Sequence, residues 1–112
     1  TRTRDFSLRV IRFYATLTRS TEAQILGKQL LRSATSVGAQ YREAQRAKSD
    51  ADFISKVEGS LQEAEETLYW LELLQGAHIG SAPEIEYLQN ETNELIAMLV
   101  TVVRRVKERP RR

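Results

Sequence analysis

The residue types that most often carry catalysis or bind metals are sparse in this chain, and their spacing suits neither task. His78 is the one histidine, and there is no cysteine. A di-metal site in a helical bundle needs Glu-x-x-His on two helices, but the residue three positions before His78 is Gln75. No nucleophile or carboxylate is predicted beside His78 either. The sequence therefore predicts no enzyme activity, no metal and no cofactor, and it makes His78 a solvated loop residue.

The carboxylates form patterns that have more than one interpretation. Glu58, Glu65 and Glu72 recur every seven residues and would form a stripe on one helix. Such a stripe can bind divalent cations weakly, but it is more often a solvated face or a partner for basic residues of a neighbouring helix. Glu63 and Glu66 are a pair of carboxylates with no predicted pocket beside them. The five glycines are scattered, which excludes a glycine-rich phosphate loop.

Charge is strongly segregated along the chain. Residues 57–103 carry nine glutamates and no lysine or arginine, whereas residues 1–56 carry eleven basic and five acidic side chains, and residues 104–112 carry six and one. One explanation is a surface that binds phosphate groups, and the other is a pairing of basic with acidic helices within or between subunits. The candidate nucleic-acid-binding residues are Arg9, Arg12, Arg19, Arg42, Arg46, Lys48, Arg104, Arg105, Lys107 and Arg109. No base-reading module accompanies them, which argues against sequence-specific DNA recognition.

Apolar residues repeat at helical spacing in four segments, which predicts a single all-α domain over residues 1–112. The predicted helices cover about residues 5–18, 22–47, 50–76 and 83–108. The expected N-caps are Asp5, Thr21, Ser49 or Asp50, and Ser81. The fourth start is the strongest, because Ser81 opens an S-x-x-E capping box and Pro83 lies near the first helical position. Helices of about 25 residues joined by short loops predict an up-down antiparallel four-helix bundle.

The middle of the second predicted helix, residues 33–39, is unusually rich in small and hydroxyl side chains. Its glycine alone costs about 1 kcal/mol relative to alanine. Small side chains allow another helix to approach closely, and that packing can offset the cost; the alternative is a hinge. The apolar stepping passes through the segment, which favours a continuous helix. The hydroxyls of Ser33, Thr35 and Ser36 are expected to bond back to helix carbonyls.

The end of the third predicted helix, residues 68–74, is apolar nearly all round. A helix in one bundle core needs only a single apolar stripe, so the excess predicts a second partner. The candidate subunit-interface residues are Tyr69, Trp70, Leu73 and Leu74. We therefore expect the chain to form a homo-oligomer.

The sequence also bears on the cellular compartment. The longest uncharged apolar run, Leu95 to Val103, has nine residues, whereas a membrane-spanning helix needs about 20. No secretory segment is visible, and the absence of cysteine suits a reducing compartment. The expectation is a cytoplasmic protein with no membrane partner.

Three stretches resemble a known family. QLLRSATSVGAQYREA from Gln29 to Ala44, SDADFISK from Ser49 to Lys56, and EAEETLYWLE from Glu63 to Glu72 are similar to the bacterial "four helix bundle protein" family. This family includes the proteins encoded in intervening sequences of large-subunit ribosomal RNA, and the resemblance covers about residues 5–106. The chain departs from the family pattern at Gln40, where asparagine is usual, and at Gln45, where cysteine is frequent.

The resemblance implies an all-α bundle that assembles into a ring-like homo-oligomer, most simply a pentamer, and it brings no catalytic residues. It also implies kinship with accessory proteins of diversity-generating retroelements, which are basic pentamers that bind nucleic acid and a reverse transcriptase. We therefore expect a non-enzymatic scaffold that binds structured RNA or RNA–DNA, with a reverse transcriptase as a further candidate partner. The alternative is a purely structural or protein-partner module with no nucleic-acid role.

Overall fold

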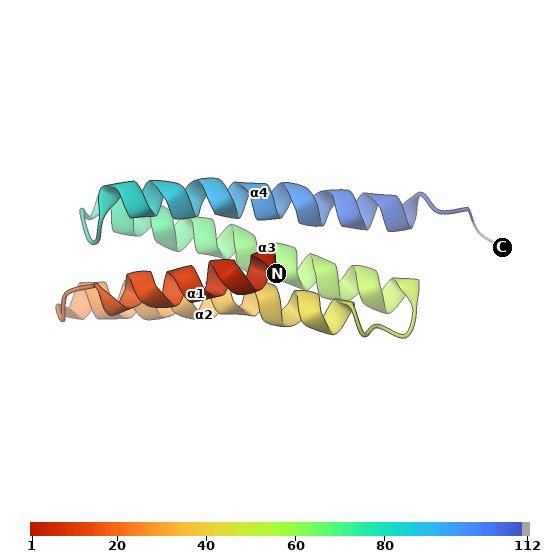
Figure 1. Ribbon diagram of the computed structural model, residues 1–112, viewed down its shortest axis with the longest axis horizontal. Helices are drawn as coiled ribbons and strands as arrows, with labels where there is room; N and C mark the ends of the chain where they lie inside the picture. Colours follow the sequence, from red (N-terminus) through yellow and green to blue (C-terminus); the bar gives the residue numbers. More distant parts are fainter. Residues whose placement is uncertain (111–112) are drawn as a thin grey trace.

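Four α-helices joined by short turns make up the computed structural model, which describes residues 1–110 (Figure 1). The helices are α1 (Arg2–Ala15), α2 (Thr21–Ala44), α3 (Asp50–Gly76) and α4 (Ala82–Lys107). Consecutive helices run in opposite directions along a rod that measures 56 × 20 × 20 Å. No strand occurs in the described residues. The predicted all-α, four-helix architecture is confirmed.

The helices form a square in which α1 and α3 occupy opposite corners. α1 packs against α2 and α4, and α3 packs against the same two helices. α1 has 14 residues, whereas the other three helices have 24, 27 and 26. Figure 1 shows that α1 therefore covers only the half of the rod that carries the α1–α2 turn. In the other half, α3 packs against both α2 and α4 without cover from α1.

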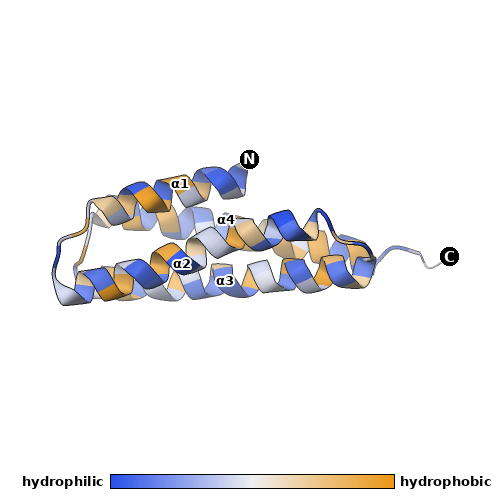
Figure 2. Ribbon diagram, turned by 90° about the horizontal axis from the view of Figure 1, so that it is seen from below, coloured by the Kyte–Doolittle hydropathy of each residue, from blue (hydrophilic) through white to orange (hydrophobic). Residues whose placement is uncertain are grey.

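The apolar core runs the length of the rod in two clusters. The cluster beneath α1 contains Phe6, Val10 and Phe13 from that helix, packed against fully buried leucines of α2, α3 and α4. The second cluster lies in the three-helix half and is built around Val37 and Val57. Figure 2 shows apolar and polar residues interspersed along the helices, and all four helices contribute buried apolar residues to the core.

The starts of α3 and α4 agree with the sequence. The hydroxyl of Ser49 accepts a hydrogen bond from the Asp52 backbone N–H at 3.0 Å, which identifies the N-cap of α3. Ser81 accepts from the Glu84 N–H at 3.4 Å, and Pro83 lies in the first turn of α4. Each cap satisfies a backbone donor that has no partner inside the helix.

The starts of α1 and α2 differ from the prediction. α1 begins at Arg2, so Asp5 lies in its first turn instead of capping it, and α1 ends at Ala15 instead of residue 18. Ser20, not Thr21, caps α2, because its hydroxyl accepts from the Ala23 N–H at 3.3 Å. α2 then ends at Ala44, three residues before the predicted end. Where several polar residues adjoin, the sequence does not determine which of them is the cap.

The small-residue segment at 33–39 lies within one continuous helix, as predicted. The Ser33, Thr35 and Ser36 hydroxyls donate to carbonyls three or four residues earlier in α2. α3 approaches closely here: the Thr67 hydroxyl donates to the Ser33 oxygen at 2.9 Å in the buried interior. This close contact between α2 and α3 accounts for the sequence of weak helix formers.

The turn between α3 and α4 rests against the end of α1. Gly80 has a φ of +89°, a conformation that side chains rarely adopt. A Cβ atom at this position would also lie 2.7 Å from Cζ of Phe13. The two turns at this end of the rod are therefore packed together through the aromatic ring of α1.

No helix among residues 1–110 is both long and apolar enough to cross a membrane.

Candidate nucleic-acid interface

Arg9 connects α1 to α4 through an ion pair. Its Nε and Nη2 atoms donate to the two carboxylate oxygens of Glu84 at 2.7 and 3.0 Å. The guanidinium also lies over the ring of Tyr87, 3.4 Å from the ring centroid. These hydrogen bonds lower the pKa of Glu84, against the opposing effect of burial, and raise the pKa of Arg9. Arg9 is thus occupied by acidic and aromatic groups of the same chain.

Two further arginines also join neighbouring helices through ion pairs. Arg2 forms a two-pronged pair with Glu91 on α4, at 2.8 and 3.0 Å. Arg32 joins α2 to α3 by donating to both Glu63 and Glu66. The hydrogen bond from Arg32 is the main reason that the pKa of Glu66 is lowered. The pair Glu63 and Glu66, which the sequence left without a role, is therefore the anchor for Arg32.

Three looser pairs lie toward the end of the rod that α1 does not reach. Lys107 is 3.7 Å from Glu58, and Arg109 is 3.4 Å from Asp50. Lys56 of α3 is 3.3 Å from Glu43, which lies in the last turn of α2. These side chains are about half exposed, so each pair contributes little to stability. Internal pairing of basic with acidic residues thus accounts for part of the charge segregation.

The structure divides the ten predicted nucleic-acid-binding residues into two groups. Arg9, Lys107 and Arg109 form ion pairs with acidic residues of the same chain. Within residues 1–110, no ion pair is formed by the other seven, which are Arg12, Arg19, Arg42, Arg46, Lys48, Arg104 and Arg105. Lys28, which the sequence-based prediction missed because it stands alone in the chain, belongs with this second group.

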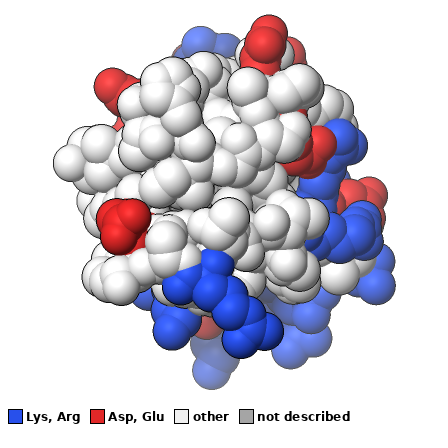
Figure 3. Space-filling model, turned by 90° about the vertical axis from the view of Figure 1, so that its left-hand side faces the viewer, with Lys and Arg blue, Asp and Glu red and all other residues white. Residues whose placement is uncertain are grey.

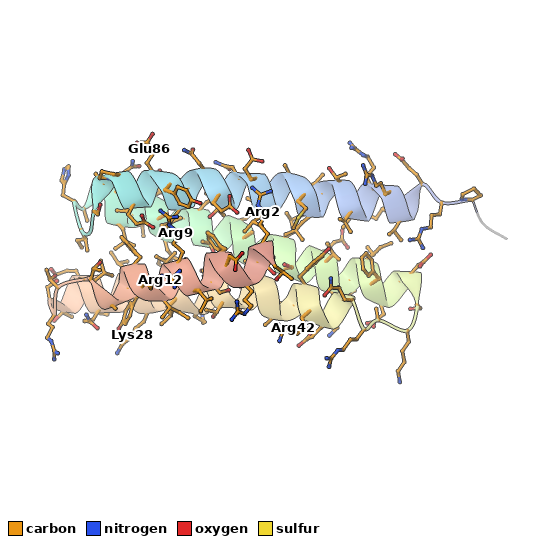
Figure 4. All side chains as sticks on the ribbon, viewed as in Figure 1. Arg2, Arg9, Arg12, Lys28, Arg42 and Glu86 are labelled. Carbon is orange, nitrogen blue, oxygen red and sulfur yellow. The ribbon has the colours of Figure 1, made fainter. Side chains whose placement is uncertain are left out.

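Six of these unpaired cations belong to α1, α2 and the turns that follow them. We call them the α1–α2 basic surface: Arg12, Arg19, Lys28, Arg42, Arg46 and Lys48. In Figure 4, Lys28 and Arg42 extend from α2 away from α4, whereas Arg2 and Arg9 lie between α1 and α4. Figure 3 shows lysine and arginine gathered toward the lower side of the rod when it is viewed end-on, which is the side of α1 and α2. These cations therefore lie along α1 and α2 and in the turns at both ends of α2.

The candidate subunit-interface residues also separate. Leu74 is fully buried in the core cluster beneath α1, so it is a core residue and not an interface residue. Tyr69 is 54% exposed and stacks edge-on against Trp70, with ring centroids 5.2 Å apart. Trp70 and Leu73 are partly exposed. On α3, Leu74 is therefore directed toward the core and Tyr69 toward the outside. Tyr69, Trp70 and Leu73 remain candidates for a subunit interface.

The residues considered for catalysis or metal binding are not brought together. His78 is exposed in the α3–α4 turn with a φ of 57°. Among residues 1–110, no three histidine, aspartate or glutamate side chains form a group that could hold a metal ion. Of the Glu58, Glu65 and Glu72 stripe, Glu58 has an ion-pair partner in the described chain. The arrangement offers charged side chains that are spread over a helical rod, together with a hollow beside α1.

Comparison with known proteins agrees with this fold. The family model described as 23S rRNA-intervening sequence protein matches residues 1–101. A crystal structure of a protein of unknown function from the S23 ribosomal protein family of Bacteroides thetaiotaomicron superposes with a TM-score of 0.84. The two sequences are 38% identical, and the match covers 91% of this chain and 94% of that one. No curated protein matches significantly. The chain belongs to the family of 23S rRNA-intervening sequence proteins.

Proposed function

We propose that this protein is a non-enzymatic, oligomeric, cytoplasmic scaffold that binds structured RNA or another nucleic acid through the α1–α2 basic surface. The observation that carries the proposal is the placement of the unpaired cations. The carboxylates of α3 and α4 neutralise Arg2, Arg9 and Arg32, but six other cations of the α1–α2 half have no such partner. Binding of a phosphate backbone requires only clustered lysine and arginine side chains.

The family supports ribosomal RNA as the first nucleic acid to test. The family's name connects its members with intervening sequences of 23S rRNA. Self-association is supported by the exposed ring of Tyr69 on the outer face of α3, beside Trp70. A ring-like pentamer and a reverse transcriptase partner are the further elements of the proposal, and they rest on the resemblance described above.

The experiment is a mobility shift with fragments of 23S rRNA at about 50 mM salt, where phosphate contacts are strongest. The double variant Arg12→Gln/Lys28→Gln removes two unpaired cations. The matched control, Lys56→Gln/Lys107→Gln, removes the same charge from residues that form ion pairs within the subunit. We expect the first variant to weaken binding and the control to bind nearly as wild type. The absence of binding by the wild-type protein at this salt concentration would overturn the proposal.

A second candidate, a purely structural or protein-partner module, is favoured by one observation. Glu65 and Glu72 lie exposed on the outer face of α3 and form no ion pair in the described part of the chain. They could face the basic surface of another copy. High salt would then loosen the oligomer, because screening weakens pairs of exposed charges. An oligomer held by Tyr69 and Trp70 would be indifferent to salt.

A further inference from the structure

A hollow opens where α1 begins and the C-terminal half of α2 continues without cover. Its volume is about 670 Å³. The hollow is lined by the first turns of α1, by residues between positions 35 and 46 in α2 and the turn after it, and by Met98 of α4. Gly38 and Ala39 contribute little or no side chain to this lining.

Four arginines and one carboxylate line the hollow, but not all of them are free to bind a ligand. Arg2 is paired with Glu91, and the one acidic residue, Glu43, is paired with Lys56 at 3.3 Å. Three cations remain. Arg42 and Arg46 form no ion pair in residues 1–110, and Arg4 lies 4.0 Å from Asp5, its neighbour in the chain.

The three remaining arginines all line the same hollow. Arg42 lies in the last turn of α2, and Arg46 follows the end of that helix. Arg4 belongs to α1. A guanidinium offers a planar fork of donors that matches the oxygens of a phosphate group, and hydrogen bonds to an ionised acceptor are the strong ones.

The hollow also has an aromatic and apolar part. Tyr41 and Met98 both line it, and both are partly exposed while they pack against the second core cluster. Tyr41 is therefore held by the core on one side and accessible on the other. An aromatic ring beside clustered arginines is the combination that binds an unpaired nucleotide, because the base stacks while the phosphate is neutralised.

We infer that this hollow binds one unpaired nucleotide, with its phosphate on Arg4, Arg42 and Arg46 and its base against Tyr41 and Met98. The inference rests on the proposed function and specifies it: the RNA is held at a single-stranded segment, since bases inside a duplex are stacked and cannot enter. A duplex would contact the arginines alone. The hollow thereby distinguishes a loop or an end of structured RNA from its helical stem.

The first test uses the full chain and uridine 5′-monophosphate as the probe, followed by amide NMR shifts. Shifts should concentrate at Gly38, Ala39 and Arg42. Inorganic phosphate should shift the same amides but bind more weakly. Arg42→Gln/Arg46→Gln should weaken nucleotide binding about tenfold or more. Arg104→Gln/Arg105→Gln removes the same charge from α4 and should change the affinity less than about threefold, because neither residue lines the hollow.

The contribution of the base is tested with Tyr41→Leu, which retains an apolar side chain against the core. This variant should lower the affinity for uridine 5′-monophosphate to that for phosphate, and leave phosphate binding unchanged. An unchanged amide spectrum away from the hollow shows that the fold is retained. The inference is overturned if millimolar nucleotide gives no shifts near Gly38, or if the two double arginine variants lose affinity equally.

A mobility shift with single-stranded and duplex 23S rRNA fragments separates this inference from the proposed function. Preferential binding of single strands, lost in Arg42→Gln/Arg46→Gln and retained in Arg104→Gln/Arg105→Gln, supports both. Equal binding of duplex and single strand by the wild type, unaffected by Tyr41→Leu, overturns the inference and leaves the proposed function intact. Nucleotide binding in the hollow without any RNA shift overturns the proposed function and supports the hollow as a nucleotide site.

Discussion

The side-chain amide of Gln40 on α2 occupies the space that a side chain at Gly59 of α3 would need. A Cβ atom added at Gly59 would overlap Oε1 of Gln40 and lie 3.1 Å from its Cδ atom. Position 40 is where the family resemblance led us to expect asparagine, whose side chain is shorter by one methylene. The contact places Gln40 within the subunit, against α3, and makes the two residues a matched pair.

Alanine at position 59 should therefore have different effects in two backgrounds. Alanine favours a helix over glycine by about 1 kcal/mol. In the wild type, displacement of the Gln40 amide offsets this gain, so Gly59→Ala should leave the free energy of unfolding unchanged or lower it. In a Gln40→Ala background, the same change should raise it by about 1 kcal/mol. Urea denaturation measures both values.

The control for the comparison of Gly59→Ala in the two backgrounds is Gly76→Ala at the end of α3. No atom lies within 4 Å of a Cβ at this position, so its effect should be the same with glutamine or alanine at position 40. Equal effects of Gly59→Ala in both backgrounds would contradict the pairing of Gln40 with Gly59.

Leu74 and Tyr69 should separate folding from assembly. Leu74 is fully buried, so Leu74→Ala should lower the free energy of unfolding by about 2–5 kcal/mol. Tyr69 is half exposed, so Tyr69→Ala should change the stability of the subunit by less than about 0.5 kcal/mol. If Tyr69 lies between subunits, as proposed, sedimentation should show smaller species with the helicity retained. Unchanged sedimentation of Tyr69→Ala would argue against this interface.

The Arg9–Glu84 pair should appear in the pH dependence of stability. Hydrogen bonds from Arg9 place the folded-state pKa of Glu84 below the ordinary value of 4.5. The stabilisation from this group is therefore complete above pH 4.5 and is lost as the pH falls through the folded-state pKa. Glu84→Gln should lower the free energy of unfolding at neutral pH. It should also flatten the acid limb, which is the fall of this free energy at low pH, as measured by urea titrations at a series of pH values.

Glu86 provides the control for that experiment. It lies on the outer side of α4, away from α1 (Figure 4), and forms no ion pair with another residue in positions 1–110. Glu86→Gln removes the same charge and should leave the acid limb as in the wild type. Parallel changes in Glu84→Gln and Glu86→Gln would show that general charge, and not the contact with Arg9, sets the profile.

Arg9 and Arg12 should behave oppositely although they are three residues apart. Arg12→Gln should leave the free energy of unfolding unchanged, weaken RNA binding, and reduce the slope of log affinity against log salt by about 0.7–0.9. Arg9→Gln should lower the stability and leave the slope unchanged, because Arg9 is held by Glu84 and Tyr87. The proposal is contradicted if Arg9→Gln reduces the slope of log affinity against log salt and Arg12→Gln does not.

Local signals in the sequence predict much of the fold because they depend on neighbouring residues. The capping box at Ser81 and the cap at Ser49 fix two helix starts, since a hydroxyl needs to reach only a backbone N–H nearby. The continuity of α2 through Gly38 also follows from local apolar spacing. α1 was harder, because several polar residues at either end of it can cap or end a helix.

The functional arrangement depends on contacts between residues distant in the sequence. Arg9 and Glu84 are 75 residues apart, and only the packing of α1 on α4 brings them together. Leu74 follows the core position Leu71 by three residues, but in an apolar stretch this wide the sequence does not show which side chains turn inward. The hollow was not predictable either, because its lining residues come from segments that are far apart in the sequence.

The turns at the two ends of the rod differ in how closely they are packed, and this difference bears on where local unfolding begins. At one end, Gly80 rests on Phe13, while Tyr14 donates to Gln24, which itself donates to the Thr18 carbonyl. At the other end, the α2–α3 turn has no cover from α1. We therefore expect fraying to begin at the α2–α3 turn and to move inward, so that amide protons there exchange first. An RNA strand held by Arg46 and Lys48 would bind the segment with the lowest local stability and slow that exchange.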